Sequence, residues 1–311
     1  MAFLFDTRTR DGHTLDALTD LENGSRIEVS RHGAELVSIE RRHARGEWIG
    51  FLYRDGDVRP ATKGWNNHAT VMGYYLHRIK NERTSYRGHE IRGGTHSFLR
   101  HKDFAAPKVE IAHNASLTYR IELEQIASHE YPFKVALALT YSLEAGKLRV
   151  TFCFENREPE LTAHVSFGLH PGFAAQSLDA ANVIMPAGDY VRHLAPDNFL
   201  SGETVAIHHD GGPMPFAKSE LPDSFLLELK NVPQPVFTFE DSAGSHRVDI
   251  DMTGVPYVTL WSNGDAFICV EPCWGLPDHH EQRPFEEKLG IQTIEPRGTL
   301  TRSFTISPRF A

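Results

Sequence analysis

The stretch Val135-Ala-Leu-Ala-Leu-Thr-Tyr-Ser-Leu-Glu-Ala-Gly-Lys-Leu-Arg-Val-Thr-Phe-Cys-Phe154 decides the fold class. Apolar side chains occupy every second position on both sides of its centre: Val135, Leu137, Leu139, Tyr141 and Leu143, then Leu148, Val150, Phe152 and Phe154. A period of two places these side chains on one face of an extended strand. Residues 144–147 supply a short turn that contains glycine. The stretch therefore predicts an antiparallel β-hairpin with one buried face.

The same alternation recurs along the whole chain, and helical spacing is scarce. Further strands are expected around a turn at His32-Gly33, around a turn at residues 241–244, and before and after Pro296-Arg297-Gly298, within 27–39, 117–123, 236–250 and 291–306. Many short strands separated by glycine and proline predict an all-β protein, a large antiparallel β-sandwich. No low-complexity linker interrupts the pattern, so we expect a single domain over residues 1–311.

Composition limits the class of protein. The chain has 311 residues, 40% of them hydrophobic, and a net charge of -9. Its basic residues are scattered, which argues against nucleic acid as a partner. No window reaches the roughly 18 apolar residues that a membrane span needs. Charged residues replace a signal peptide's apolar core near the start: Asp6, Arg8, Arg10 and Asp11. Three cysteines are too few for a disulfide framework: Cys153, Cys269 and Cys273. We expect a cytoplasmic protein.

Two segments early in the chain gather cations and histidines at predicted strand ends. Arg78 ends an aromatic stretch over residues 67–81, and its guanidinium suits vicinal hydroxyls or a carboxylate. A surface ion pair is the commoner fate of a single arginine. His96 and His101 lie in a glycine-containing segment, but their separation puts them on opposite faces of a strand. With no His-x-His or His-Glu-x-x-His motif in the chain, a metal site there is weakly supported.

His170 and Glu271 are the two candidates for acid-base chemistry. Pro171 holds His170 in an extended or turn backbone, and a histidine titrates near neutral pH. A structurally satisfied histidine is the alternative, as it is for His164 in mid-strand. Glu271 follows a continuous apolar run, where a carboxylate is costly unless it is paired or functional. The alternative for Glu271 is a structural role, in which it caps a turn or pairs with an arginine. Nearby, Trp274 offers a flat apolar surface for a sugar.

The cysteines near Glu271 show no catalytic pattern. We expect Cys269 to lie in the core and Cys273 to lie in a loop.

Four segments in this order resemble the aldose 1-epimerase (galactose mutarotase-like) family, and in particular its branch of shorter bacterial hexose-mutarotase-like proteins. The resemblance covers most of the chain. It rests on Tyr75-Leu-His-Arg-Ile-Lys-Asn81, His96-Ser-Phe-Leu-Arg100, Gly168-Leu-His-Pro-Gly-Phe173 and Phe267-Ile-Cys-Val-Glu-Pro272, with Lys288-Leu-Gly-Ile291 and Glu295-Pro-Arg-Gly298 as similar closing strands.

The resemblance implies a supersandwich with a sugar bound in a cleft on one concave face. It implies a reaction without cofactor or metal that interconverts the α and β anomers of a free hexose. Glu271 would be the base and His170 the acid, and His96 would donate to the ring oxygen or the C1 oxygen. Arg78 would hold sugar hydroxyls, and Asp223, within Leu221-Pro-Asp-Ser-Phe225, would grip others. For Asp278, a role in forming a turn is as good an explanation as a contact with the sugar.

Departures from the family pattern touch the wall of the site and leave the substrate open. Ser97 stands where the family usually has glycine, His77 precedes Arg78, and Cys273 separates Pro272 from Trp274. Three cations suit either a phosphate or sulfonate on the sugar or a solvated rim: Lys80, Arg83 and Arg100.

Two other classes of function compete with the enzyme. A non-catalytic sugar-binding protein on the same scaffold would use Arg78 and the tryptophans: Trp65, Trp261 and Trp274. A metal-dependent β-sandwich of the cupin type is motivated by the 18 histidines and by Asp278-His279-His280. The oligomeric state is not indicated by the sequence.

Overall fold

The hairpin predicted around residues 144–147 forms the middle of the largest sheet. The computed structural model describes residues 2–243 and 246–310. Strands β11 (Val135–Glu144) and β12 (Lys147–Asn156) pair in unbroken antiparallel register from Val135 opposite Asn156 to Glu144 opposite Lys147. Ala145 and Gly146 both have positive φ, 48° and 74°, as a two-residue turn with the twist of a hairpin requires. The prediction of this hairpin is confirmed.

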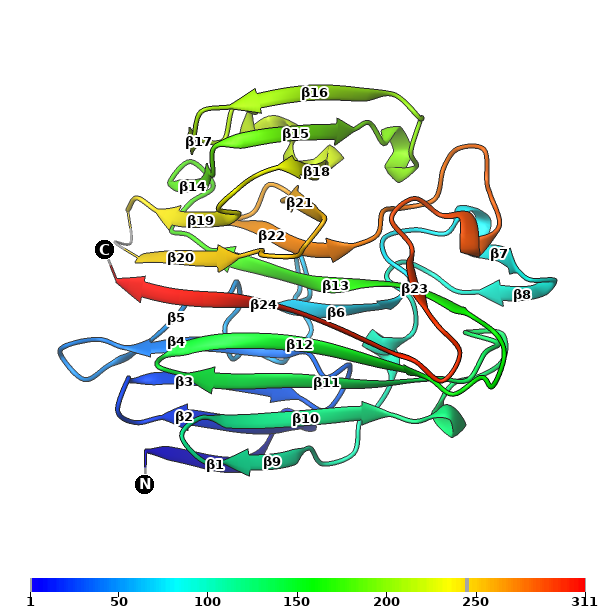
Figure 1. Cartoon of the computed structure of the whole chain (residues 1–311). Coiled ribbons are helices and arrows are strands. Elements are labelled where there is room, and N and C mark those ends of the chain that lie inside the picture. The colour runs from blue at the N-terminus through cyan, green and yellow to red at the C-terminus, as the bar shows by residue number, and fades with distance from the viewer. Residues whose placement is uncertain (1, 244–245, 311) are drawn as a thin grey trace.

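Nine strands make this sheet, in the order β17-β14-β19-β20-β24-β12-β11-β10-β9 (Figure 1). Besides the hairpin they are β9 (Lys108–Ile111), β10 (Ala115–Ile121), β14 (Ala181–Met185), β17 (Gly212–Pro213), β19 (Val236–Asp241), β20 (His246–Asp251) and β24 (Thr299–Phe310). The predicted strands on both sides of the turn at 241–244 are confirmed; Gly244 itself lies outside the described residues.

A second, eight-stranded sheet carries the order β16-β15-β18-β21-β22-β13-β23, and β6 also pairs with β13. Its strands are β6 (Ala69–Tyr74), β13 (Ala163–Ala174), β15 (Gly188–His193), β16 (Thr204–His209), β18 (Phe225–Asn231), β21 (Tyr257–Trp261), β22 (Phe267–Trp274) and β23 (Gln292–Ile294). Every pairing between these named strands is antiparallel.

Two smaller sheets complete the described strands. A five-stranded sheet lies behind β9–β12 in Figure 1 and contains β1 (Phe3–Arg10), β2 (His13–Asp20), β3 (Ser25–Ser30), β4 (Leu36–Arg42) and β5 (Trp48–Gly50). A two-stranded sheet contains β7 (Arg83–Tyr86) and β8 (His89–Arg92). The all-β, antiparallel sandwich predicted from the sequence is confirmed.

Short 3-10 turns are the helical elements of the described chain: η1 (Lys80–Glu82), η2 (Leu99–His101), η3 (Leu123–Gln125), η4 (Pro196–Asn198), η5 (Lys218–Asp223) and η6 (Phe285–Glu287). Within the described ranges, no helix has the length and the apolar character that crossing a bilayer would take.

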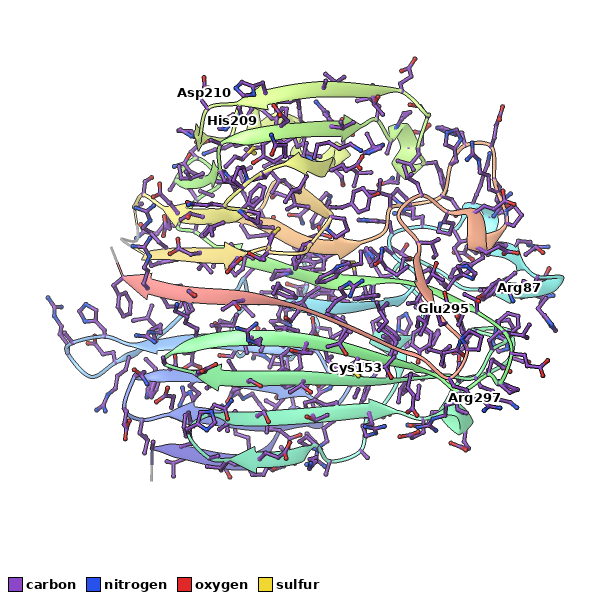
Figure 2. The ribbon with its side chains drawn as sticks, viewed as in Figure 1. Arg87, Cys153, His209, Asp210, Glu295 and Arg297 are labelled. Atoms are coloured by element: carbon purple, nitrogen blue, oxygen red, sulfur yellow. The ribbon has the colours of Figure 1, made fainter. Side chains whose placement is uncertain are left out.

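Aromatic side chains join the two large sheets. Phe152 on β12 lies 5.1 Å, centroid to centroid, from Phe167 on β13. Phe167 in turn stacks on Trp274 of β22 at 5.1 Å and an interplanar angle of 19°. Cys153, labelled in Figure 2, is adjacent to Phe152 in the chain and lies on the other, half-exposed face of β12. The alternation seen in the sequence thus separates core from surface on β12, whereas β6, β13 and β22 of the eight-stranded sheet are buried almost throughout.

The position of Trp274 corrects one prediction. Strand β22 continues through Trp274, and Ile268, Val270 and Trp274 belong to the core cluster. Glu271 lies three positions before Trp274, an odd number, so the two side chains project from opposite faces. Trp274 is 1% exposed and donates its Nε1–H to the Gly254 carbonyl at 3.2 Å. It packs in the core and is not among the residues that line the cavity described below, so the prediction of a sugar-binding role for it is wrong.

Cys273 corrects a second prediction. It is a buried residue of β22 and not part of a loop, whereas the expectation that Cys269 is buried is confirmed.

Replacing Phe152 with alanine is expected to lower the free energy of unfolding by about 3–5 kcal/mol, because the missing ring leaves a cavity between the two sheets. Phe5→Ala is the control, since Phe5 is 37% exposed. Urea denaturation of Phe152→Ala, Phe5→Ala and wild type measures the difference. Equal effects of the two substitutions would show that the ring contacts between the sheets contribute little.

Candidate active site

A cavity of about 330 Å³ opens on the face of the eight-stranded sheet that points away from the core. Five strands contribute side chains to it: Thr70 from β6, His170 from β13, Leu226 from β18, Thr259 and Trp261 from β21, and Glu271 from β22. Loops add the rest of its wall: Trp65, Asn67, His77, Arg78, Thr95, His96, Arg100, Ala195, Asn198, Asp223, Ser224 and Pro277. Its volume and mixed lining are those of a small-molecule site.

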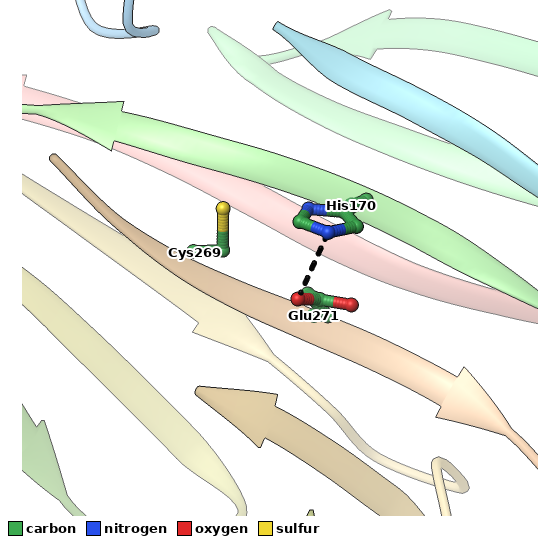
Figure 3. A group of neighbouring side chains, drawn as sticks. All are labelled: His170, Cys269 and Glu271. Atoms are coloured by element: carbon green, nitrogen blue, oxygen red, sulfur yellow. Dashed lines mark ion pairs between the residues drawn. The ribbon is translucent and has the colours of Figure 1, made fainter. Parts of the chain in front are cut away.

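His170 and Glu271 meet at the floor of this cavity. They come from the neighbouring strands β13 and β22, and His170 Nε2 lies 3.4 Å from Glu271 Oε1 (Figure 3). Their exposed fractions are 7% and 1%. Burial raises the pKa of Glu271 well above its ordinary value and lowers the pKa of His170 to about 3. The surroundings therefore favour the uncharged form of both groups.

Two more histidines, the buried His96 and the half-buried His77, lie beside this pair. The His96 ring is 5.2 Å from the His170 ring and perpendicular to it, and the His77 ring is 5.7 Å from that of His96. The His96 amide donates to the His77 carbonyl at 2.7 Å, which ties the loop to the end of β6. Burial, followed by the neighbouring His170, lowers the pKa of His96, and burial lowers the pKa of His77 to about 3. All three imidazoles are favoured in their neutral form.

Several polar atoms of this cluster have no hydrogen-bond partner among the described residues: His77 Nε2, His96 Nδ1, His170 Nδ1 and Glu271 Oε2. Buried polar groups are nearly always paired in folded proteins. Their concentration at one cavity marks it as a place where a polar ligand is recognised.

Two tryptophans form the apolar wall that the sequence had assigned to Trp274. Trp65 lies 4.9 Å and Trp261 lies 5.5 Å from the His170 ring, centroid to centroid. A Cβ at Gly172 would lie 2.6 Å from Trp65, so glycine is required there for the indole to cover β13. The sequence suggests both tryptophans only for the alternative of a non-catalytic sugar-binding protein; the spacing of Thr259 and Trp261, two residues apart on β21, puts Trp261 on the cavity face.

Charged residues of the site lie nearer its mouth. Arg78 and Asp223 are exposed and line the cavity. Arg100 also lines the cavity and donates to Asn67 Oδ1 at 3.2 Å. Lys80 instead donates its ammonium group to the His280 carbonyl. Lys80, Arg83 and Arg100 were the three candidates for binding a phosphate or sulfonate on the sugar. Of these, only Arg100 is among the residues that line the cavity.

Asp278 has a structural role. Its carboxylate forms a buried ion pair with Lys288 and accepts the Lys80 amide at 2.9 Å. Its own amide donates to the Arg78 carbonyl at 3.1 Å. Asp278 therefore holds the backbone of Arg78 in place from outside the cavity. His164, also a structural residue, accepts or donates a hydrogen bond with the Tyr86 hydroxyl at 3.0 Å.

The fold is that of the galactose mutarotase-like proteins. A galactose mutarotase related enzyme from Lactobacillus acidophilus superposes with a TM-score of 0.79 at 22% identity, covering 98% of this chain and 97% of that one. A galactose mutarotase-like protein from Lactobacillus casei ATCC 334 gives 0.77 at 20% identity, over 98% and 100% of the two chains.

The chain belongs to the aldose 1-epimerase family, whose model matches residues 17–265. The match includes Arg78, His96, His170 and Asp223, and it ends before Glu271. In sequence, the chain is 22% identical over 298 residues to the plasmid-encoded protein LacX of Lactococcus lactis subsp. lactis, covering 90% of this chain and 95% of LacX.

Histidines that are favoured in their neutral form by the fold make stability depend on pH. Because the pKa of His77 falls from 6.5 to about 3 on folding, the unfolded chain binds more protons between these values, and stability falls as pH drops below about 6.5. Between pH 7 and pH 5, the free energy of unfolding should decrease in both proteins, and the decrease should be about 2 kcal/mol smaller in His77→Asn than in wild type. Urea denaturation at both pH values measures this, with exposed His113→Asn as the control. An unchanged difference would mean that His77 is protonated in the folded protein.

Breaking the buried pair at Lys288 is expected to destabilise the protein by about 3–5 kcal/mol, because Asp278→Asn leaves a buried ammonium without its partner. The double variant Asp278→Asn/Lys288→Met removes both charges and should recover part of that loss. Thermal and urea unfolding of the two variants provide the comparison. A double variant less stable than the single one would contradict this account of the pair.

Proposed function

We propose that this protein is a mutarotase that interconverts the α and β anomers of a hexose or modified hexose. The observation that carries the proposal is the His170–Glu271 pair, 3.4 Å apart at the floor of a cavity of about 330 Å³. Membership of the aldose 1-epimerase family supports it.

Each half-reaction moves two protons. Glu271, as the carboxylate, removes the proton from the C1 hydroxyl while His170, as the imidazolium, protonates the ring oxygen. The bond between C1 and the ring oxygen breaks, and C1 becomes the carbonyl carbon of an open-chain aldehyde. After rotation about the C1–C2 bond, the same two transfers in reverse close the ring on the other face of C1.

The burial of the pair suits this cycle. Ring opening leaves Glu271 protonated and His170 neutral, which are the forms that burial favours. The ionised and neutral forms of the pair contain the same number of protons. One transfer between Glu271 Oε1 and His170 Nε2 converts one into the other, so no proton has to be exchanged with solvent. Positioned acid-base catalysis of this kind contributes about 10²–10⁴-fold per group.

Other residues bind the sugar. A neutral His96 donates a hydrogen bond to the ring oxygen or the C1 oxygen, as its contact with the His170 ring allows. Arg78 and Asp223 bind hydroxyls at the cavity mouth, where both line the wall. Trp65 and Trp261 pack against the C–H face of the ring, because aromatic surface excludes water there.

Glu271→Gln and His170→Asn should each slow anomer interconversion by about 10²–10⁴-fold, because each removes one proton-transfer group. Polarimetry and proton NMR on a panel of free, 6-phosphorylated and 6-sulfonated hexoses measure the rates and identify the preferred substrate. Glu22→Gln, an exposed surface change, is the control and should leave the rates unaltered. Thermal unfolding of each variant establishes that it is folded.

A different outcome favours the second candidate, a non-catalytic sugar-binding protein. If wild type binds a hexose saturably but equilibrates no sugar faster than buffer does, the enzyme proposal fails. Trp65, Trp261 and Arg78 line the cavity and would then carry sugar binding alone.

The single-domain organisation, the cytoplasmic location and the lack of nucleic-acid and membrane partners stay predictions from the sequence.

A further inference from the structure

Cys269 lies next to the His170–Glu271 pair, and the proposed reaction does not use it. One ligand-type atom from each of the three residues, a ring nitrogen, a thiol sulfur and a carboxylate oxygen, lies within 4.8 Å of the others. All three side chains are buried, and they project from the adjacent strands β13 and β22 in Figure 3. Within residues 2–243 and 246–310, this is the one such group of three.

The strand geometry explains why the thiol is close to the pair. Cys269 and Glu271 are two residues apart on β22 and share one face of it. Opposite Cys269 on β13 is Gly172, which has no side chain. A Cβ at Gly172 would lie 3.4 Å from Cys269 Sγ, in ordinary van der Waals contact, so the thiol packs directly beside the strand that carries His170.

This donor set is the one that zinc selects. Imidazole nitrogen, thiolate and carboxylate are its protein ligands, with bonds of about 2.0–2.3 Å in a tetrahedron. Two ligand atoms bonded at about 2.0–2.1 Å are about 3.3–3.4 Å apart in that geometry. The separation of His170 Nε2 and Glu271 Oε1 is 3.4 Å. The spacing therefore allows one ion to join both atoms without moving either strand.

Charge and unpaired atoms favour the same conclusion. A thiolate and a carboxylate balance the two positive charges of the ion, so the complex adds no net charge to a buried site. Glu271 Oε2 has no hydrogen-bond partner among the described residues, although Glu271 is 1% exposed. The cavity lies in front of the pair and leaves the fourth position of the ion to water or a sugar oxygen.

We propose that His170, Cys269 and Glu271 form a site for a zinc-type divalent cation, and that its occupation switches off the enzyme. Binding releases the protons of the thiol and of the carboxyl group to solvent and uses the lone pair of His170 Nε2. Neither member of the pair can then exchange a proton with a sugar. The inhibitory part rests on the proposed function, whereas the metal site itself does not.

Metal binding is tested with Zn²⁺ alone, in competition with a chromophoric chelator. Wild type should bind one equivalent of Zn²⁺. Cys269→Ala should bind Zn²⁺ at least about 100-fold more weakly, because mutating even a residue that only hydrogen-bonds to a metal ligand can lower metal affinity by that factor, and Cys269 is itself a ligand. Cys273→Ser is the matched control, since Cys273 is equally buried on the same strand. Co²⁺ provides a second readout, through a thiolate charge-transfer absorption that Cys269→Ala and Cys269→Ser should lack.

Two results would overturn the site. Cys269→Ala could bind Zn²⁺ as tightly as wild type, which would assign the metal to other residues such as the surface histidines. Cys273→Ser could lose binding equally, which would indicate a general effect of altering the buried strand. Thermal unfolding separates a lost site from a lost fold, and Cys269→Ser replaces Cys269→Ala if the latter does not fold.

Inhibition is measured as the anomerisation rate with Zn²⁺ relative to the metal-free rate of the same variant. Wild type should lose activity with one equivalent and regain it with EDTA, while Cys269→Ala should be inhibited only at about 100-fold higher Zn²⁺. Cysteine-dependent binding without anomerase activity in any sample would leave the metal site standing and overturn the mutarotase. Anomerase activity without cysteine-dependent binding would do the reverse.

Discussion

The antiparallel pairing of β13 with β22 is the constraint on which the site depends. On β22, Ile268, Val270 and Trp274 belong to the core, while Glu271 lines the cavity on the other face. The two strands bring His170 within 3.4 Å of Glu271. Because side chains alternate along a strand, a register shift of one residue would exchange the core and cavity sets. One pairing therefore fixes both the packing and the chemistry.

Such a site is costly to build. It buries a carboxyl group and two imidazoles and half-buries a third, that of His77, and the directions of their pKa shifts show that burial opposes the charge of each. The stacked aromatic core on the opposite face of the same strands offsets that cost, through contacts such as that of Phe167 with Trp274. The buried pair of Asp278 with Lys288 fixes the loop behind Arg78. Stability and reactivity are thus separated by strand face.

The same two strands explain both proposals. A neutral-favouring pair suits a sugar that opens and closes, because each half-reaction returns the proton that the other removed. The Cys269 thiol completes a set of metal ligands, since Cys269 lies opposite Gly172, two residues from His170 on β13. Membership of the aldose 1-epimerase family supports the proposed reaction class. Arg100 lines the cavity, where its guanidinium could bind an anionic substituent of the sugar.

By itself, the sequence determined the local features of this protein. Alternating apolar residues specify strands through a period of two, so the hairpin around Ala145-Gly146 and the all-β class could be predicted. Residues in local motifs, such as His170 before Pro171, could be named as candidates. Tertiary structure alone decided which faces meet. Trp274 lies in the core, and Trp65 packs against the His170 ring. The length of a strand and its pairing with distant strands determine which way a side chain points, and neither can be predicted from neighbouring residues.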